Sequence, residues 1–260
     1  MVKRFDPSQL PLELLIDASN AARDGIRIAL RDGRLTVQRV KPIPVDCLAA
    51  IVEDAPIRAL EYVVVDVETT GGSFTSGHRI TEIAAVRLRG DGTRTAEFRS
   101  LINPERPILP FVTALTRISW DMVKDAPRFV DVAPDIARIL DGAVFVAHNA
   151  GFDWRFVRAE LQRAGTTVTG NTLCTVRLAK HVVPEIRRRS LDALSYFFDI
   201  HNEARHRAYG DARATAEVLR RLLDRCDTLE VTRWQELQQL LGRRAPRRKR
   251  QANPHAATDE

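Results

Sequence analysis

The stretch EYVVVDVETTGG at residues 61–72 constrains the fold more than any other part of the chain. Its short apolar run, Tyr62 to Val65, predicts a buried β-strand that ends in a glycine-containing loop. Side chains two residues apart in a strand point to the same face. The carboxylates of Asp66 and Glu68 are therefore expected to project together from the end of a buried strand.

Further strands and helices follow in an order that predicts an α/β layered domain. Strands are expected at residues 80–88, 96–102 and 143–147. Helices are expected around residues 113–122, 130–140, 153–164 and 211–223, and another is expected to begin at Ser190. The hydroxyl of Ser190 can cap the first turn of its helix.

The remaining segments predict how the chain is divided. Residues 1–60 contain an amphipathic stretch near 12–30 and a strand candidate at 35–40, but no chemical motif, and are expected to form an N-terminal accessory segment of unknown role. Residues 61–225 are expected to form the α/β domain. A C-terminal helix over 226–242 and a basic, disordered tail over 243–260 are expected to follow.

Composition narrows the classes of protein to which the chain can belong. No apolar run approaches the roughly 20 residues that span a bilayer, and the N-terminus lacks the apolar core of a signal peptide, so a cytoplasmic protein with no membrane partner is predicted. The three cysteines, Cys47, Cys174 and Cys226, are too dispersed for a zinc ribbon or a disulfide framework. The net charge of +6 is concentrated in the tail, which can attract phosphate backbones or remain solvated.

Acidic residues stand at the ends of three predicted core elements. Asp66 and Glu68 repel each other unless a cation lies between them, and their hard oxygen atoms suit Mg²⁺ or Mn²⁺. Asp153 lies in the first turn of a predicted helix that follows a core strand, where open α/β sheets collect their ligands. Singly, these residues can also be a solvated strand-end pair and a helix-start aspartate that complements the helix dipole.

The third element is the segment HRAYGD at residues 206–211. Histidine can accept a proton from water near neutral pH, so His206 is a candidate general base, and Asp211 at the start of the last helix can hold a metal. A single loop histidine is usually polar surface. The combination of three such elements in one chain is what indicates a catalytic site.

The order Asp-x-Glu, Asp, His-x₄-Asp resembles the DEDDh 3′-5′ exonuclease superfamily, especially the proofreading (epsilon) subunit of bacterial DNA polymerase III and its free-standing relatives. The resemblance covers about three fifths of the chain, from residue 61 to 223, and all five catalytic positions are filled. It is carried by DVETTG at 66–71, AHNAGFD at 147–153 and HRAYGDA at 206–212, and extends through RITEI at 79–83, residues 115–127 and SLDAL at 190–194.

This resemblance implies a ribonuclease-H-like fold, in which helices flank a five-stranded mixed sheet whose first three strands are antiparallel. It also implies two divalent cations, Mg²⁺ or Mn²⁺. By resemblance, Asp66 bridges both ions, Glu68 and Asp211 complete the site on the side of the nucleophile, and Asp153 serves the second ion. His206 is implied as the general base, which accepts a proton from the attacking water.

The resemblance further implies contacts to the terminal nucleotide and release of a nucleoside 5′-monophosphate. The residues expected at this position are Thr69, Thr116, Ile118, Asn149 and Phe152. The family often has glycine where this chain has Arg117, so nucleotide binding is the part of the resemblance from which the sequence departs.

Three functions follow as hypotheses. The first is hydrolysis of DNA from single-stranded or frayed 3′ ends, in proofreading or repair, with a DNA polymerase subunit as a candidate partner. The second is trimming of RNA 3′ ends, as by ribonuclease T or oligoribonuclease, because DNA is told from RNA by contacts at the 2′ position. The third is a non-catalytic polymerase- or nucleic-acid-binding module. The presence of all four carboxylates and of His206 argues against a non-catalytic module. The histidine of the DEDDh class and the proofreading-type motif AHNAGFD at 147–153 favour DNA over RNA as substrate.

Overall fold

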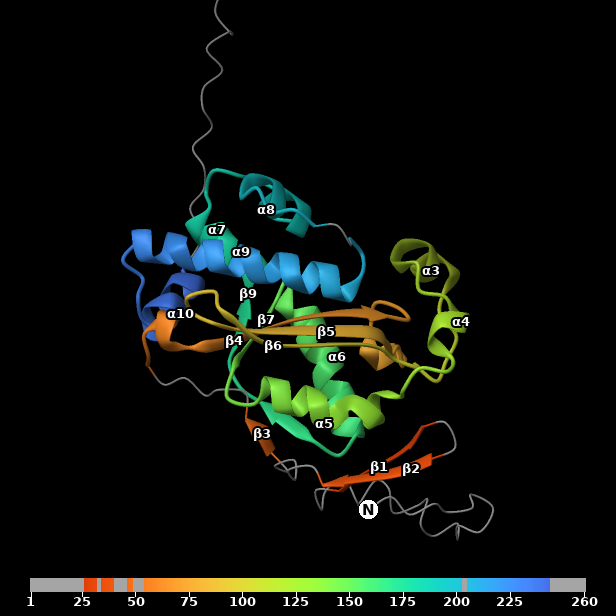
Figure 1. Ribbon diagram of the computed structural model, residues 1–260. Coiled ribbons are helices and arrows are strands. Elements are labelled where there is room, and N and C mark those ends of the chain that lie inside the picture. The colour runs from red at the N-terminus through yellow and green to blue at the C-terminus, as the bar shows by residue number, and fades with distance from the viewer. Residues whose placement is uncertain (1–25, 32–33, 40–45, 49–53, 203–204, 244–260) are drawn as a thin grey trace, which may run out of the picture.

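A five-stranded mixed sheet lies at the centre of the molecule (Figure 1). The computed structural model describes residues 26–31, 34–39, 46–48, 54–202 and 205–243. The spatial order of the strands is β6-β5-β4-β7-β9. Their bounds are Glu61–Thr69 for β4, Ile80–Arg89 for β5, Arg94–Leu101 for β6, Val144–Ala147 for β7 and Thr172–Cys174 for β9. Strands β4, β5 and β6 are antiparallel, whereas β7 and β9 continue the sheet parallel to β4. The predicted fold class is confirmed.

Helices cover both faces of this sheet (Figure 1). One face carries α7 (Thr175–Val182), α8 (Leu191–Phe197), α9 (Ala208–Thr228) and α10 (Trp234–Gly242). The other face carries α5 (Phe129–Leu140) and α6 (Ala150–Arg163). The alternation of β4 divides the core accordingly, because Tyr62 and Val64 pack with α9 while Val63, Val65 and Val67 pack with α5 and α6.

The helix expected over residues 113–122 is divided into α3 (Pro110–Thr116) and α4 (Trp120–Val123). Arg117 adopts a left-handed conformation with φ 59°, and its backbone N–H donates to the carbonyl oxygen of Thr113. Ser119 is extended before α4 begins. The predicted single helix was therefore wrong, because a left-handed residue ends an α-helix.

The first part of the chain adds small elements. Strands β1 (Ile26–Arg31) and β2 (Arg34–Arg39) form an antiparallel pair, and β3 (Asp46–Leu48) is parallel to β8 (Thr167–Thr169). Two short 3₁₀ turns, η2 (Ile57–Ala59) and η3 (Phe74–Ser76), precede and follow β4. Residues 1–25 of the predicted accessory segment and residues 244–260 of the predicted tail lie outside the described residues.

Residues 54–60 are tied to the sheet and to the C-terminal helices. Ile57 is fully buried in the core beneath α9 and α10, and its N–H donates to the carbonyl oxygen of Thr232 at 2.8 Å. The division of the chain at residue 60 stays a prediction, as does that at 225, where α9 continues to Thr228 and a turn separates it from α10. No helix in the described part of the chain is both long and apolar enough to cross a membrane.

Candidate active site

The carboxylates of β4 lie on the face of the sheet that α9 covers. Asp66 and Glu68 continue the alternation of Tyr62 and Val64, so both point toward that helix, and both are half-buried. Asp211 approaches from the first turns of α9. One ligand oxygen from each of Asp66, Glu68 and Asp211 lies within 4.8 Å of the other two. The structure thus brings together three of the four predicted metal ligands.

The fourth carboxylate, Asp153, reaches the site from the opposite layer. Asn149 adopts a left-handed conformation with φ 76° directly before α6, so the helix starts abruptly at the end of β7. The Asp153 side chain is buried, and its Oδ1 accepts a hydrogen bond from the backbone N–H of Val67 at 3.2 Å. Its oxygens are not part of the group of three, but this bond places it beside Asp66.

An ion pair holds α6 in place two turns after Asp153. Arg79, which directly precedes β5, donates from Nε and Nη2 to the two carboxylate oxygens of Glu160, at 2.6 and 2.9 Å. Glu160 is buried and Arg79 is half-buried, and the bidentate geometry fixes the orientation of both groups. The position of Asp153 is therefore determined by a bidentate contact as well as by helix packing.

His206 lies on the loop that leads into α9, and its side chain is exposed. Its backbone has φ 58°, and its N–H donates to Oδ2 of Asp211 at 3.1 Å. Nδ2 of Asn202 donates to the other carboxylate oxygen of Asp211 at 2.7 Å. The neighbouring Arg205 forms an ion pair with Asp192. The His206 side chain thus extends from a loop whose backbone is held against the candidate ligand Asp211.

Glu82 is a residue whose role sequence reasoning missed. It lies directly opposite Glu68 in the β4–β5 pair and is buried, yet Nε and Nη2 of Arg207 donate to its two oxygens at 3.0 and 2.7 Å. The backbone N–H of Ala208, the first residue of α9, donates to it at 3.0 Å. A charged residue within the apolar strand ITEIAAV was the available signal.

Burial raises the pKa values of the four carboxyl groups, and neighbouring charges add to the effect at Asp66 and Glu68. Burial raises the pKa of Asp66 well above its ordinary range, and the charges of Asp153, Glu68 and Asp211 raise it further. Burial and the charge of Asp211 raise the pKa of Glu68 to about 7. Burial alone raises the pKa of Asp153 to about 7, and it also raises that of Asp211 despite the hydrogen bonds that Asp211 accepts.

These properties fit a hard divalent cation. The three clustered side chains, Asp66, Glu68 and Asp211, offer only oxygen atoms, which are the ligands that Mg²⁺ and Mn²⁺ prefer. Their raised pKa values show that the negative charges lack sufficient compensation from the protein itself. A divalent cation would supply that compensation. The cluster can therefore hold such an ion.

The residues predicted to bind the terminal nucleotide fall into two groups. The side chains of Thr69, Thr116 and Ile118 are buried at 7%, 2% and 0% exposure, whereas Asn149 is exposed and Phe152 is half-buried. The hydroxyl of Thr116 donates to the carbonyl of Val112 and accepts from the N–H of Ile118, so it stabilises the end of α3. The assignment of all five to substrate binding stays a prediction.

The loop after β4 has a specific requirement for glycine at position 71. A Cβ atom there would lie 2.4 Å from the His78 ring, which accounts for the glycine by packing within the protein. Nδ1 of that ring is 3.0 Å from the hydroxyl of Thr70, so the ring is fixed. At Gly72 a Cβ would have no atom within 4 Å. Open space at this loop therefore lies at Gly72 and not at Gly71.

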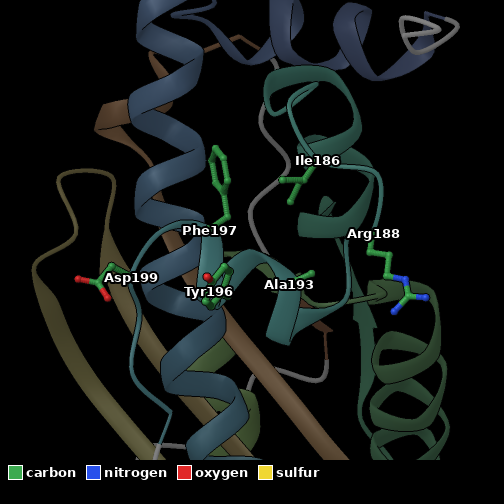
Figure 2. A pocket seen from close by; sticks show the side chains of 6 residues that line it. All are labelled: Ile186, Arg188, Ala193, Tyr196, Phe197 and Asp199. Atoms are coloured by element: carbon green, nitrogen blue, oxygen red, sulfur yellow. The ribbon is translucent and has the colours of Figure 1, made fainter. Parts of the chain in front are cut away.

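A separate hollow of about 610 Å³ lies beside α8 (Figure 2). It is lined by Ile186, Arg188, Ala193, Tyr196, Phe197 and Asp199. None of the residues predicted for catalysis, metal binding or nucleotide binding belongs to this lining.

Known proteins resemble this chain in sequence and in fold. Residues 63–219 match the protein family described as Exonuclease. The DNA polymerase III PolC-type protein of Caldanaerobacter subterraneus is 37% identical over 181 residues, which are 70% of this chain and 13% of that protein. The DNA polymerase III subunit epsilon-like protein of Rhodobacter capsulatus is 42% identical over 174 residues, which are 65% of this chain and 25% of that protein.

A solved structure, Exonuclease X in complex with 5′ overhanging duplex DNA, is also similar. It superposes with a TM-score of 0.54 at 31% identity, covering 70% of this chain and 99% of that one. By contrast, this chain spans only a small part of the two curated relatives. The family match covers more than half of the chain and includes all five predicted catalytic positions. The chain belongs to the exonuclease family, and the resemblance to the DEDDh 3′-5′ exonucleases predicted from its sequence is confirmed.

Proposed function

We propose that the chain is a metal-dependent 3′-5′ exonuclease that hydrolyses phosphodiester bonds of DNA and releases nucleoside 5′-monophosphates. The observation that carries this proposal is the convergence of Asp66, Glu68 and Asp211 within 4.8 Å of one another, with Asp153 and the exposed His206 beside them. Carboxylates gathered in this way suit the binding of divalent cations at a phosphodiester.

Each residue has a role that follows from its position. Asp66, Glu68 and Asp211 would hold one cation, and Asp153, next to Asp66, would help to hold a second. When bound, such ions supply the positive charge that stabilises the entering and leaving oxygens during in-line displacement at phosphorus. His206 accepts the proton of the attacking water, because its side chain is exposed on a loop whose backbone is fixed to Asp211.

The choice of DNA as substrate is supported by the relatives. Two of them are named as DNA polymerase III proteins, and the similar solved structure is a complex with duplex DNA. We infer that single-stranded or frayed DNA 3′ ends are the substrate, in proofreading or repair, and that a DNA polymerase subunit is a candidate partner. Mg²⁺ and Mn²⁺ are both candidate cofactors. The cytoplasmic location remains a prediction.

Digestion of a 5′-labelled single-stranded DNA tests the proposal. With Mg²⁺ or Mn²⁺ we expect a ladder that shortens from the 3′ end, and none with EDTA. Asp66→Asn should lower the rate about a thousandfold, because it weakens binding of the ions that stabilise the transition state. Asp121→Asn removes an equal charge from an exposed position on α4 and should leave the rate unchanged.

An RNA strand of the same sequence separates the two substrate classes. Faster cleavage of DNA than of RNA supports the proposal, while the reverse would assign the chain to RNA 3′-end trimming. Failure to cut either strand with any divalent cation would leave the binding module as the function of this domain.

A further inference from the structure

A second groove adjoins the carboxylate cluster on the outer edge of the sheet. It has a volume of about 380 Å³. Its walls come from Glu82 of β5, Arg99 of β6, and Arg207 and Tyr209 at the start of α9, so β5 and α9 contribute to both this groove and the candidate active site. Gly210, which also lines the groove, directly precedes the candidate ligand Asp211.

The ring of Tyr209 is the centre of a positively charged cluster. The guanidinium carbon of Arg99 lies 4.8 Å from the ring centroid, and that of Arg213 lies 5.6 Å from it. The Tyr209 hydroxyl donates to Oε2 of Glu97 at 2.6 Å, so the ring is anchored at its far end. Cation–π contacts of this kind hold guanidinium groups without neutralising their charge.

The balance of charge leaves two of the arginines in this region available. Arg207 is neutralised by Glu82, and Arg94 forms an ion pair with Glu217 at 3.1 Å. Arg99 and Arg213 are both exposed, and neither forms an ion pair with a carboxylate of the described residues. Two exposed guanidinium groups that form no such pair within the described part of the chain suit a doubly hydrogen-bonded oxyanion, above all phosphate.

The sheet register fixes the distance of this cluster from the candidate metal ligands. Asp66 lies opposite Ala84, and Ala84 lies opposite Arg99, so the three residues form one row across β4, β5 and β6 and share one face. Adjacent strands are about 4.8 Å apart, which places the Arg99 backbone about 10 Å from that of Asp66. Because a nucleic-acid strand carries one phosphate per nucleotide, a strand that reaches the carboxylate cluster can present another of its phosphates at this distance.

We propose that Arg99 and Arg213, held over the ring of Tyr209, bind a backbone phosphate of the nucleic acid other than the phosphate that is cleaved. This inference rests on the proposed function, because it takes the strand that enters the carboxylate cluster as its ligand. The site acts on affinity and on the alignment of the strand. It has no part in the bond-breaking step, since it contains no group that reaches the scissile phosphate.

The test compares wild type with Arg99→Gln, Arg213→Gln and the double variant. Arg138→Gln serves as the control, because it removes the same charge from an exposed position on α5, which covers the opposite face of the sheet. Binding of fluorescent single-stranded DNA, from about two to about eight nucleotides long, is measured by anisotropy without divalent ions over a series of salt concentrations. Hydrolysis of the p-nitrophenyl ester of thymidine 5′-monophosphate is measured with Mn²⁺.

The double variant should bind the longer strands about tenfold more weakly than wild type, while the shortest strands should bind equally well. Each lost phosphate contact lowers the salt slope by about 0.7, so the loss of affinity between about 50 and about 200 mM salt should shrink by a factor of about 2.5 per contact. Ester hydrolysis should be unchanged, because this substrate has no second phosphate.

Affinity and salt slope equal to those of Arg138→Gln at every length would overturn the inference. So would a parallel loss of ester hydrolysis, because the cluster would then belong to the carboxylate site. The failure of the proposed function looks different: the wild type would hydrolyse neither ester nor DNA, while the binding measurements would still decide on the phosphate site.

Discussion

Glu82 lies on the same face of the sheet as Glu68, the face that α9 covers. Its surroundings give it a different role from that of the clustered acids. Both of its oxygens are occupied by Arg207, and one of them also accepts from the N–H of Ala208 at the start of α9. A carboxylate at a helix N-terminus is favoured by the helix dipole. Glu82 therefore positions the start of α9, and with it the loop of His206.

Replacement of this residue should reduce catalysis without unfolding the protein. We expect Glu82→Ala to lower kcat about 10- to 100-fold, in the range observed for groups that orient metal ligands. Glu82→Gln should lose less, because its amide oxygen can still accept from Ala208. KM for DNA and the circular dichroism spectrum should change little. A normal kcat in Glu82→Ala with a lowered Tm would reduce Glu82 to a purely structural role.

The raised pKa values of the clustered acids predict how stability depends on pH. In unfolded protein these groups titrate near pH 4, whereas folding raises the pKa values of Glu68 and Asp153 to about 7. The folded state then binds more protons than the unfolded state between about pH 4 and about pH 7. In EDTA, the contribution of Glu68 and Asp153 to the free energy of unfolding should therefore fall as the pH rises through this window.

A divalent cation should remove this penalty, because it binds the ionised carboxylates of the folded state. Thermal unfolding in EDTA and in millimolar Mg²⁺ or Mn²⁺, at about pH 5 and about pH 8, provides the measurement. The rise in Tm caused by the metal should be larger at the higher pH. An equal rise in Asp66→Asn would show that the ion stabilises the fold from another site.

Single residues also show how far a sequence can be interpreted. The alternation of β4 predicted that Asp66 and Glu68 share a face, and the division of the core on either side of that strand agrees. This prediction was possible because side chains alternate between the two faces of a strand, and that alternation depends only on neighbouring residues in the sequence. The contact of Glu82 with Arg207 joins residues 125 positions apart, and local patterns contain no information about such a pair.

At the scale of elements, the break between α3 and α4 has a definite energetic cost. Arg117 holds a left-handed conformation, with φ 59°, which is unfavourable for residues with a Cβ atom by about 1 kcal/mol or more. The sequence does not predict this break, because residues 111–122 contain no glycine or proline that would signal the end of a helix. Glycine, frequent here in the family, needs no strain to adopt this conformation.

Arg117→Gly should therefore stabilise the protein. We expect a gain of about 0.5 to 1 kcal/mol, and a rise in Tm of about 2 °C, measured by thermal unfolding. Ala114→Gly is the matched control within α3, where glycine should cost about 1 kcal/mol. A loss of stability in Arg117→Gly would mean that the exposed guanidinium contributes more than the backbone strain costs.

At the scale of the whole molecule, the residues that precede β4 contact the last two helices, α9 and α10. The backbone N–H of Trp234 at the start of α10 donates to the carbonyl of Ala55, and the hydroxyl of Tyr62 in β4 donates to the carbonyl of Ile57. Arg58 forms ion pairs with Asp224 and Asp227 of α9. Residues before the first central strand thus connect that strand to the last two helices.

The resemblance in sequence motifs begins at residue 61, because those motifs consist of the candidate catalytic residues and the segments that carry them. Residues that contribute only to packing are not part of such motifs. The packing of the preceding residues depends on α9 and α10, whose contacts with Ile57 are set by tertiary structure. A boundary at residue 60 therefore describes where the resemblance begins. A chain that starts at residue 61 would lose the Ile57 side chain from its core and the acceptor of the Tyr62 hydroxyl.

Ile57→Ala isolates the apolar part of this connection. The side chain is fully buried in the core, so its truncation should lower the free energy of unfolding by about 2 to 4 kcal/mol and the Tm by several degrees. Arg58→Gln, which removes partly exposed ion pairs, should cost less than about 1 kcal/mol. Both variants should keep wild-type ester hydrolysis well below their Tm, because the carboxylates lie at the opposite end of β4. If Ile57→Ala unfolds at the wild-type temperature, residues 54–60 do not belong to the cooperative unit, and the domain begins where the resemblance does.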